Sequence, residues 1–303
     1  MSLKALKAKC WAKKQVKKNL KVKEPINCEA YIHSADKKAL EALKKIPLLD
    51  TICGKILPIL NDACVDIITK ASLIHINEKQ MPKIYFMVKS ICNKIGIKMP
   101  EIYLELNREV NAFVYGTEKY TLIINSGLLE CLEDDEIYAV LAHECGHIAC
   151  KHSLYYSVAS MVLGYGRIGL EEIGAMLGSK GILGSVFGGV LSAVDSALEL
   201  AFYQWYRYSE LSADRVAAIC CGSAKPVVET MIRLAGGTTQ IGAETNKELF
   251  IEQAKEYKEM IAKSSTNKFL EFLLTKNDTH PLLAVRAYEI EEFASRDIFK
   301  GIK

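Results

Sequence analysis

An HExxH motif, in which His143 and His147 flank Glu144, constrains the fold of this chain more than any other feature. It closes the stretch 134–142, whose pattern is typical of a helix. Residues i and i+4 lie on one helical face, so both imidazole rings can reach the same metal ion. Glu144 would then lie beside a metal-bound water, whose pKa zinc lowers to about 7, and could take its proton. The alternative is a chance motif, or two core histidines on a buried helix. The spacing favours a zinc-dependent hydrolase with one Zn²⁺ per chain.

A third protein ligand is expected on another helix, because a catalytic zinc normally has three such ligands and an open fourth position. Glu210 and Asp214 are the best candidates, since they share a helical face downstream of the motif. One of them would bind zinc while the other accepts a hydrogen bond from a ligand histidine. A Glu and an Asp at this spacing are usually just solvated surface residues. Only the upstream HExxH motif makes a metal-binding role for this pair the preferred interpretation.

Four separated motifs follow the order seen in a known family. They are Asn111-Ala112-Phe113, the HExxH motif, Glu210 to Asp214, and Thr279-His280-Pro281 followed by Arg286. Through them the chain resembles the HtpX-like and CAAX-prenyl-protease-like zinc metallopeptidases over roughly residues 45–295. The resemblance implies a zincin-type fold and a zinc endopeptidase activity.

The resemblance also implies roles for individual residues. His143, His147 and Glu210 would bind zinc, Glu144 would be the general base, and Asp214 would orient a ligand histidine, namely His143.

Further roles that the resemblance implies concern substrate and transition state. Asn111 and His280 are candidates for contacting the substrate or the oxyanion, which needs preorganised donors. Without the resemblance, His280 is typical of an ordinary loop residue before a helix. Arg286 is expected to pair with a carboxylate of the active-site region, with a plain surface arginine as the alternative.

Cys145 departs from the usual pattern, because a leucine or another apolar residue is common at its place in the motif. A small buried hydrophobe is the favoured interpretation of its thiol. The alternatives are an additional soft metal ligand and an oxidation-sensitive group near zinc.

Composition narrows the class of protein. Half of the 303 residues are apolar, which supports a substantial core in one large domain or two small ones. A net charge of +3 is too small to indicate a nucleic-acid binder. Ten cysteines without a secretory signal favour a reducing compartment, so the predicted location is cytoplasmic.

The N-terminus is strongly basic, with nine lysines between Lys4 and Lys23. A flexible solvated tail is favoured over a basic amphipathic helix that touches an anionic membrane surface. The segment lacks a continuous apolar run and a cleavage site, so it is not predicted to be a signal peptide. We therefore expect residues 1–35 to form a basic tail or helix, and residues 36–303 to form a single metallopeptidase domain.

Three short β-strands are predicted at 102–106, 112–114 and 121–124. The strand that follows Asn111 is expected at the sheet edge beside the active-site helix. Extended substrate could add to this edge through backbone hydrogen bonds, which makes Ala112 and Phe113 the predicted substrate-binding residues.

Helices are predicted over most of the remainder, so the fold class is mostly α with a small β-sheet (α+β). Their expected ranges are 36–70 with a break at Pro47, 82–95, 134–147, 206–221, 226–235, 244–262, 269–274 and 282–293.

An apolar insertion at about 157–200 carries nine of the nineteen glycines between Gly164 and Gly189. The uncharged run 181–194 near its centre has 14 residues, and the run 152–166 has 15. Both are shorter than the approximately 20 residues that a spanning helix needs. No transmembrane helix is therefore predicted. The glycines are compatible with a mobile flap over the cleft and with close helix packing. The sequence does not decide whether this segment makes peripheral membrane contact.

Two functions from different classes remain at this point. The favoured one is a zinc endopeptidase that acts on peptides or unfolded proteins, and the other is a zinc-stabilised chaperone-like or interaction protein. Glu144 favours the enzyme, because structural zinc needs no general base. The sequence reveals neither the substrate nor the oligomeric state.

Overall fold

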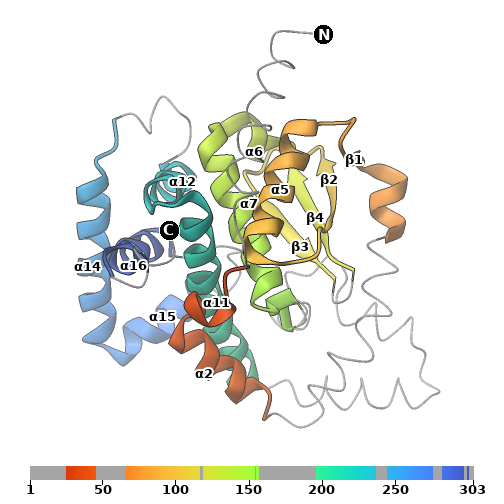
Figure 1. The fold of residues 1–303 in the computed structure, drawn as a ribbon. Coiled ribbons are helices and arrows are strands. Elements are labelled where there is room, and N and C mark those ends of the chain that lie inside the picture. Colours follow the sequence, from red (N-terminus) through yellow and green to blue (C-terminus); the bar gives the residue numbers. More distant parts are fainter. Residues whose placement is uncertain are drawn as a thin grey trace, which may run out of the picture.

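A computed structural model describes residues 25–45, 66–116, 119–153, 155–156, 196–236, 244–275, 282–296 and 299. This part of the chain is mostly helical and contains one small mixed sheet, as the sequence predicted. Figure 1 shows the sheet on one side of the molecule beside helices α5 and α7, with α14 and α15 on the opposite side. Helix α11 lies between these two parts.

The sheet has four strands, one more than expected. They are β1 (Ile74–Ile76), β2 (Glu101–Glu105), β3 (Ala112–Tyr115) and β4 (Thr121–Asn125). Strand β1 was missed because three residues are too few to show an alternating pattern. The order is β1-β2-β4-β3, with β2 and β4 parallel and the other two pairs antiparallel. Strand β3 is therefore an edge strand, as predicted, and it packs next to α7.

The helices are α2 (Ser34–Leu43), α5 (Pro82–Ile95), α6 (Ser126–Cys131), α7 (Asp134–Ala149), α11 (Ser196–Cys221), α12 (Lys225–Gly236), α14 (Lys247–Ala262), α15 (Ser265–Thr275) and α16 (Leu283–Ser295). Most of them agree with the predicted ranges, but α6 was not predicted and α11 begins at Ser196 instead of 206. The bounds of α5 follow from its ends: Pro82 occupies the first turn, and Gly96 ends the helix with a φ of 73°.

Helix α7 is the central element of the fold. Its start is fixed by the Glu136 carboxylate, which accepts a hydrogen bond of 2.7 Å from the backbone N–H of Glu133. Three acidic residues in the first turn stabilise the helix, because they lie at the positive end of its dipole. Twelve of its sixteen residues are buried, which is expected of a helix that packs on several sides.

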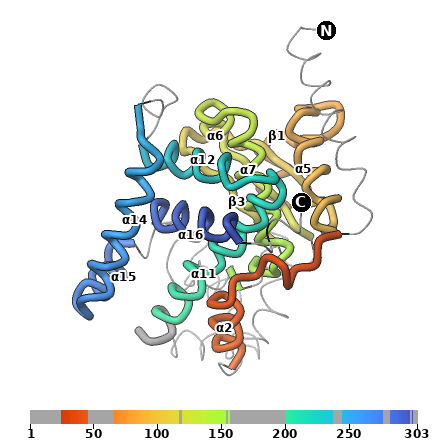
Figure 2. Tube along the Cα trace, turned by 60° about the vertical axis from the view of Figure 1, so that its left-hand side comes forward, coloured from red at the N-terminus to blue at the C-terminus, as the bar shows by residue number. Residues whose placement is uncertain are grey.

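The N-terminal helix α2 packs against α11, at the bottom of the view in Figure 1. Figure 2 shows the same neighbourhood from another side. Tyr31, just before α2, is buried in the hydrophobic core, and Leu43 of α2 is also buried. Residues distant in sequence from the HExxH motif thus form part of the surroundings of α11.

Several predicted features fall on residues that are not described. The basic stretch 1–24, most of the glycine-rich insertion (157–195), and His280 with Pro281 lie outside the described residues. No helix in the described part of the chain is both long enough and apolar enough to cross a bilayer.

Candidate metal centre

The site is built where α7 crosses α11, and Gly146 permits their close approach. A Cβ atom at Gly146 would lie 3.0 Å from the Cα atom of Ala213 and 3.1 Å from the Cβ atom of Val216. The α11 backbone therefore comes closer to α7 than a larger residue would allow. This contact brings the histidines of α7 against the carboxylates of α11.

Side-chain atoms of three residues converge at this crossing. The Nε2 atoms of His143 and His147 are 3.1 Å apart. Oε2 of Glu210 lies 3.4 Å from Nε2 of His143, and Oε1 of Glu210 lies 3.2 Å from Nε2 of His147. Ligand atoms about 2.0–2.1 Å from a tetrahedral metal are about 3.3 Å from one another, from the geometry of a tetrahedron. The donors fit a zinc ion in both type and spacing.

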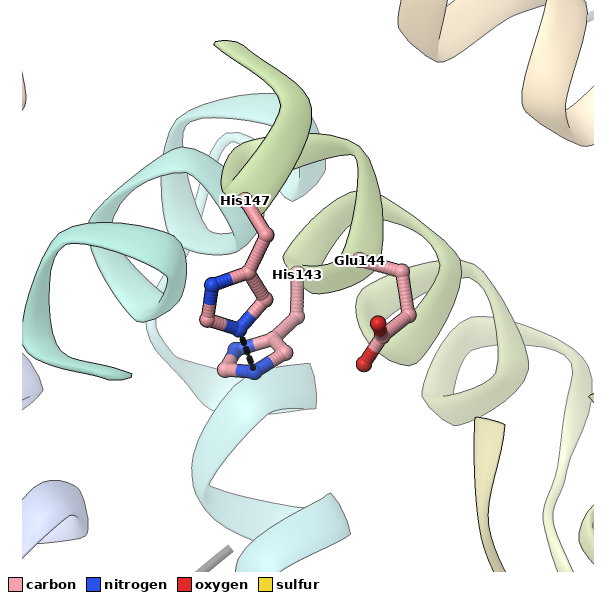
Figure 3. Close-up of side chains that lie close together, drawn as sticks. All are labelled: His143, Glu144 and His147. Carbon is pink, nitrogen blue, oxygen red and sulfur yellow. Dashed lines mark hydrogen bonds between the residues drawn. The ribbon is translucent and has the colours of Figure 1, made fainter. Parts of the chain in front are cut away.

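The side chains of His143, His147 and Glu210 form a ligand triangle, and Glu144 lies beside it. Figure 3 shows both imidazole rings meeting on one side of α7, with the Glu144 carboxylate next to them. Ligand atoms of His143, His147 and Glu144 also lie within 4.8 Å of one another, which is compatible with Glu144 as the third ligand. Glu210 contacts the Nε2 atoms of both histidines, so the structure offers two candidates for the third ligand, Glu144 and Glu210.

Asp214 and Arg286 form a buried ion-pair network behind the ligands. Nδ1 of His143 is 2.9 Å from the Asp214 carboxylate. Arg286, on α16, donates two hydrogen bonds to Asp214 at 2.8 and 2.7 Å and contacts Glu210 at 2.8 Å. The predicted contact of Arg286 with a carboxylate of the site is therefore present, and the surface alternative is wrong because its side chain is 7% exposed.

The surroundings of the two histidines shift their pKa values in opposite directions. Burial opposes the charged form of His143, but Glu210 and the hydrogen bond to Asp214 outweigh it and raise the pKa to about 10. Burial dominates at His147 and lowers the pKa to about 3. Burial also disfavours the Asp214 carboxylate, yet Arg286 holds its pKa below the usual value. Asp214 is thus a carboxylate suited to accept the Nδ1–H of His143, which leaves Nε2 directed at the metal position.

A small cavity of about 40 Å³ adjoins His143 and Glu144. Its volume is enough for about three water molecules at the ~10–15 Å³ that each requires. The polar residues among the other lining residues are Asn111, Asp214, Thr230 and Arg286, and the apolar majority are Val110, Ala112, Leu128, Ala139, Val140, Val227, Met231 and Leu234. The predicted residues Asn111 and Ala112 thus face the site. Oδ1 of Asn111 is buried and has no hydrogen-bond partner among the described residues.

Cys145 lies on α7 but belongs to the apolar core rather than to the metal centre. It is fully buried and is a member of the core cluster. A hydrogen bond with Cys92, together with burial, raises the pKa of its thiol well above the usual value. The favoured interpretation of Cys145 as a small buried hydrophobe agrees with this position.

Two residues near the site were missed by the sequence analysis. His152 lies 3.0 Å from Nδ1 of His147, and Asp36 lies 2.9 Å from the other side of the His152 ring. Asp36 and His152 are 116 positions apart, so no local spacing could have linked them. The only signal in the sequence was a further histidine five residues after the motif.

Comparison with known proteins shows the family of this chain. The model of peptidase family M48 matches residues 78–294, which is more than half of the chain. The chain belongs to peptidase family M48. This M48 peptidase is therefore a metal-dependent protease, and its His-Glu-His group is the candidate metal site.

Individual relatives of this M48 peptidase carry related names. The chloroplastic plastoglobule-localized metallopeptidase 48 of Arabidopsis thaliana is 24% identical over 91% of this chain and 76% of its own length. A protease HtpX homolog of Trichormus variabilis is 29% identical over 56% of this chain and 63% of its own length. A crystal structure of S. mikatae Ste24p is 14% identical, with a TM-score of 0.39, over 95% of this chain and 63% of that one. The matches thus cover less than two thirds of the HtpX homolog and of Ste24p.

Proposed function

We propose that this chain is a zinc-dependent endopeptidase in which His143, His147 and Glu210 hold the metal. The observation that carries the proposal is the ligand triangle, in which the Nε2 atoms of His143 and His147 are 3.1 Å apart and lie 3.4 and 3.2 Å from the two oxygens of the Glu210 carboxylate. Two imidazoles and one carboxylate are a donor set that would suit a catalytic zinc ion. When bound, zinc would lower the pKa of a water molecule and polarise the substrate carbonyl.

Glu144 is the proposed general base. Its carboxylate is buried beside the ligand triangle, so it can take a proton from the attacking water and deliver it to the leaving amine. Asp214 holds the His143 ring in the tautomer that presents Nε2. Arg286 offsets the negative charge that Glu210 and Asp214 place in the interior.

Substrate would bind along β3. This strand is at the sheet edge and packs next to α7, so an added peptide strand would run past the metal centre. Ala112 and Phe113 are the proposed backbone contacts, and Asn111 would donate its amide N–H to the developing oxyanion. His280 stays a proposed second contact. The substrate class is a peptide or an unfolded protein, bound by backbone with limited side-chain selectivity.

The proposal is tested by zinc content and cleavage of unfolded casein. The wild type should bind one zinc ion and cleave. Glu144→Gln should retain zinc and lose about 10²–10⁴-fold in rate, the range that a general base contributes. Glu210→Gln should lose zinc. Glu136→Gln is a matched control, because Glu136 is buried on the same helix but pairs with Arg233.

Each outcome has a definite meaning. Zinc retained by the wild type without cleavage of any unfolded protein would favour the chaperone-like alternative. Unchanged zinc stoichiometry in Glu210→Gln would exclude Glu210 as a ligand. The cytoplasmic location and peripheral membrane contact remain predictions, which fractionation with and without high salt would check.

A further inference from the structure

A chain of buried polar groups extends from His147 away from the ligand triangle. Nδ1 of His147 is 3.0 Å from Nδ1 of His152, and Nε2 of His152 is 2.9 Å from the Asp36 carboxylate. Ser212 donates a further hydrogen bond of 2.6 Å to the same carboxylate oxygen. The side chains of His152 and Asp36 are 0% and 2% exposed, so water does not compete for these contacts.

Only one arrangement of protons satisfies every contact when His147 binds a metal through Nε2. Nδ1 of His147 must then carry the proton and donate it to Nδ1 of His152. His152 must in turn carry its proton on Nε2 and donate it to Asp36. The carboxylate is the acceptor at the end, where it also receives the Ser212 hydroxyl. The direction of the chain is therefore fixed by chemistry.

We propose that His152 and Asp36 are positioning residues that orient the ligand His147 and increase its basicity toward the metal. This inference rests on the proposed zinc site. His143 receives the corresponding support directly from Asp214, whereas His147 receives it through an intervening imidazole. Carboxylates behind a ligand histidine fix the ring and strengthen its lone pair, typically changing metal affinity about 10–100-fold.

The hydrogen-bonded relay from His147 through His152 to Asp36 ends on a helix distant in sequence from the metal ligands. Asp36 lies on α2, outside the residues 78–294 that match the family model. Helix α2 is held on α11, where Ser212 accepts a hydrogen bond of 2.9 Å from the backbone N–H of His33 and donates one to Asp36. The N-terminal helix is thus part of the metal centre, because full metal affinity requires it to be docked.

Co²⁺ binding to the full chain tests the relay. Affinity is measured by competition with a chelator, and the visible absorption of bound Co²⁺ reports the ligand geometry. Circular dichroism of each metal-free variant shows that it is folded. Asp36→Asn keeps the shape of the side chain and removes its charge, and should weaken Co²⁺ binding by about 10-fold. His152→Phe removes both hydrogen bonds while keeping a ring against Trp205, and should weaken it by about 10–100-fold.

His152→Asn separates positioning from packing. The Asn side-chain oxygen can replace Nδ1 of His152 as acceptor for His147, but it cannot reach Asp36. The relay predicts tighter Co²⁺ binding by His152→Asn than by His152→Phe. A purely structural role predicts the opposite order, because phenylalanine fills the ring volume better. This comparison also decides the matter if Asp36→Asn does not fold.

Glu210→Gln and Glu136→Gln complete the experiment. The first should abolish Co²⁺ binding, and the second should leave affinity and spectrum unchanged. If the wild type binds no Co²⁺, or if Glu210→Gln binds as the wild type does, the proposed function fails. If Glu210→Gln loses the metal while Asp36→Asn and both His152 variants keep wild-type affinity and spectrum, the relay is overturned and the zinc site stands.

Discussion

Replacing Arg286 with methionine removes a cationic side chain that contacts both Glu210 and Asp214. Methionine retains most of the aliphatic length, so the change isolates the charge. Arg286 makes contacts of 2.7–2.8 Å with both carboxylates. The side chains involved are 7%, 1% and 3% exposed, so solvent screens these interactions weakly.

The expected loss in the free energy of unfolding is about 3–5 kcal/mol, as for other buried pairs broken on one side. Two hydrogen bonds to a charged group, at about 1.5–3 kcal/mol each, give a similar sum. The loss arises because the two buried carboxylates lose the guanidinium charge that contacts both of them. Lys258→Met is the matched control: its partner is Glu289, the two side chains are 44% and 24% exposed, and such pairs contribute about 0–1 kcal/mol.

Urea denaturation in the presence of a chelator measures both variants, followed by circular dichroism and by tryptophan fluorescence. Coincident transitions from the two probes would allow a single free energy to be extracted. A loss below about 1 kcal/mol for Arg286→Met, equal to that of the control, would refute the claim that Arg286 compensates the buried carboxylates.

Four further outcomes are expected. Gly146→Ala should destabilise the protein by about 1–3 kcal/mol and weaken zinc binding, because its Cβ would lie 3.0 Å from the Cα atom of Ala213. Gly236→Ala is the control, since its Cβ would have no neighbour nearer than 4.0 Å, and it should change neither stability nor zinc affinity. Urea denaturation and zinc titration measure the two effects. Zinc at a hundred times its Kd should stabilise the wild type by about 2.7 kcal/mol and Glu210→Gln not at all, as measured by urea denaturation. Native labelling with iodoacetamide, read by mass spectrometry, should modify the partly exposed Cys131 long before the buried Cys145. Asn111→Ala should lower kcat/KM by about 10²–10³-fold with unchanged zinc stoichiometry; an equal loss of zinc would mean that Asn111 supports the fold instead.

Local sequence patterns predicted most of the elements because helix periodicity, proline and glycine act over a few residues. The bounds of α5 were set in this way by Pro82 and Gly96. Strand β1 was too short to carry such a signal, and its place in the sheet depends on pairing with β2 across about thirty residues. The edge position of β3 was predicted, and the order of the four strands was not.

The sequence by itself determined that His143 and His147 share a helical face with Glu144 beside them, because that follows from 3.6 residues per turn. Together with the family resemblance, it also singled out Glu210, Asp214 and Arg286. The tertiary structure decided which carboxylate lies against both Nε2 atoms and which lies behind Nδ1, because that choice depends on the packing of α7 on α11 at Gly146. It alone brought Asp36 to His152, since a contact between distant positions is set by packing and leaves no spacing to recognise.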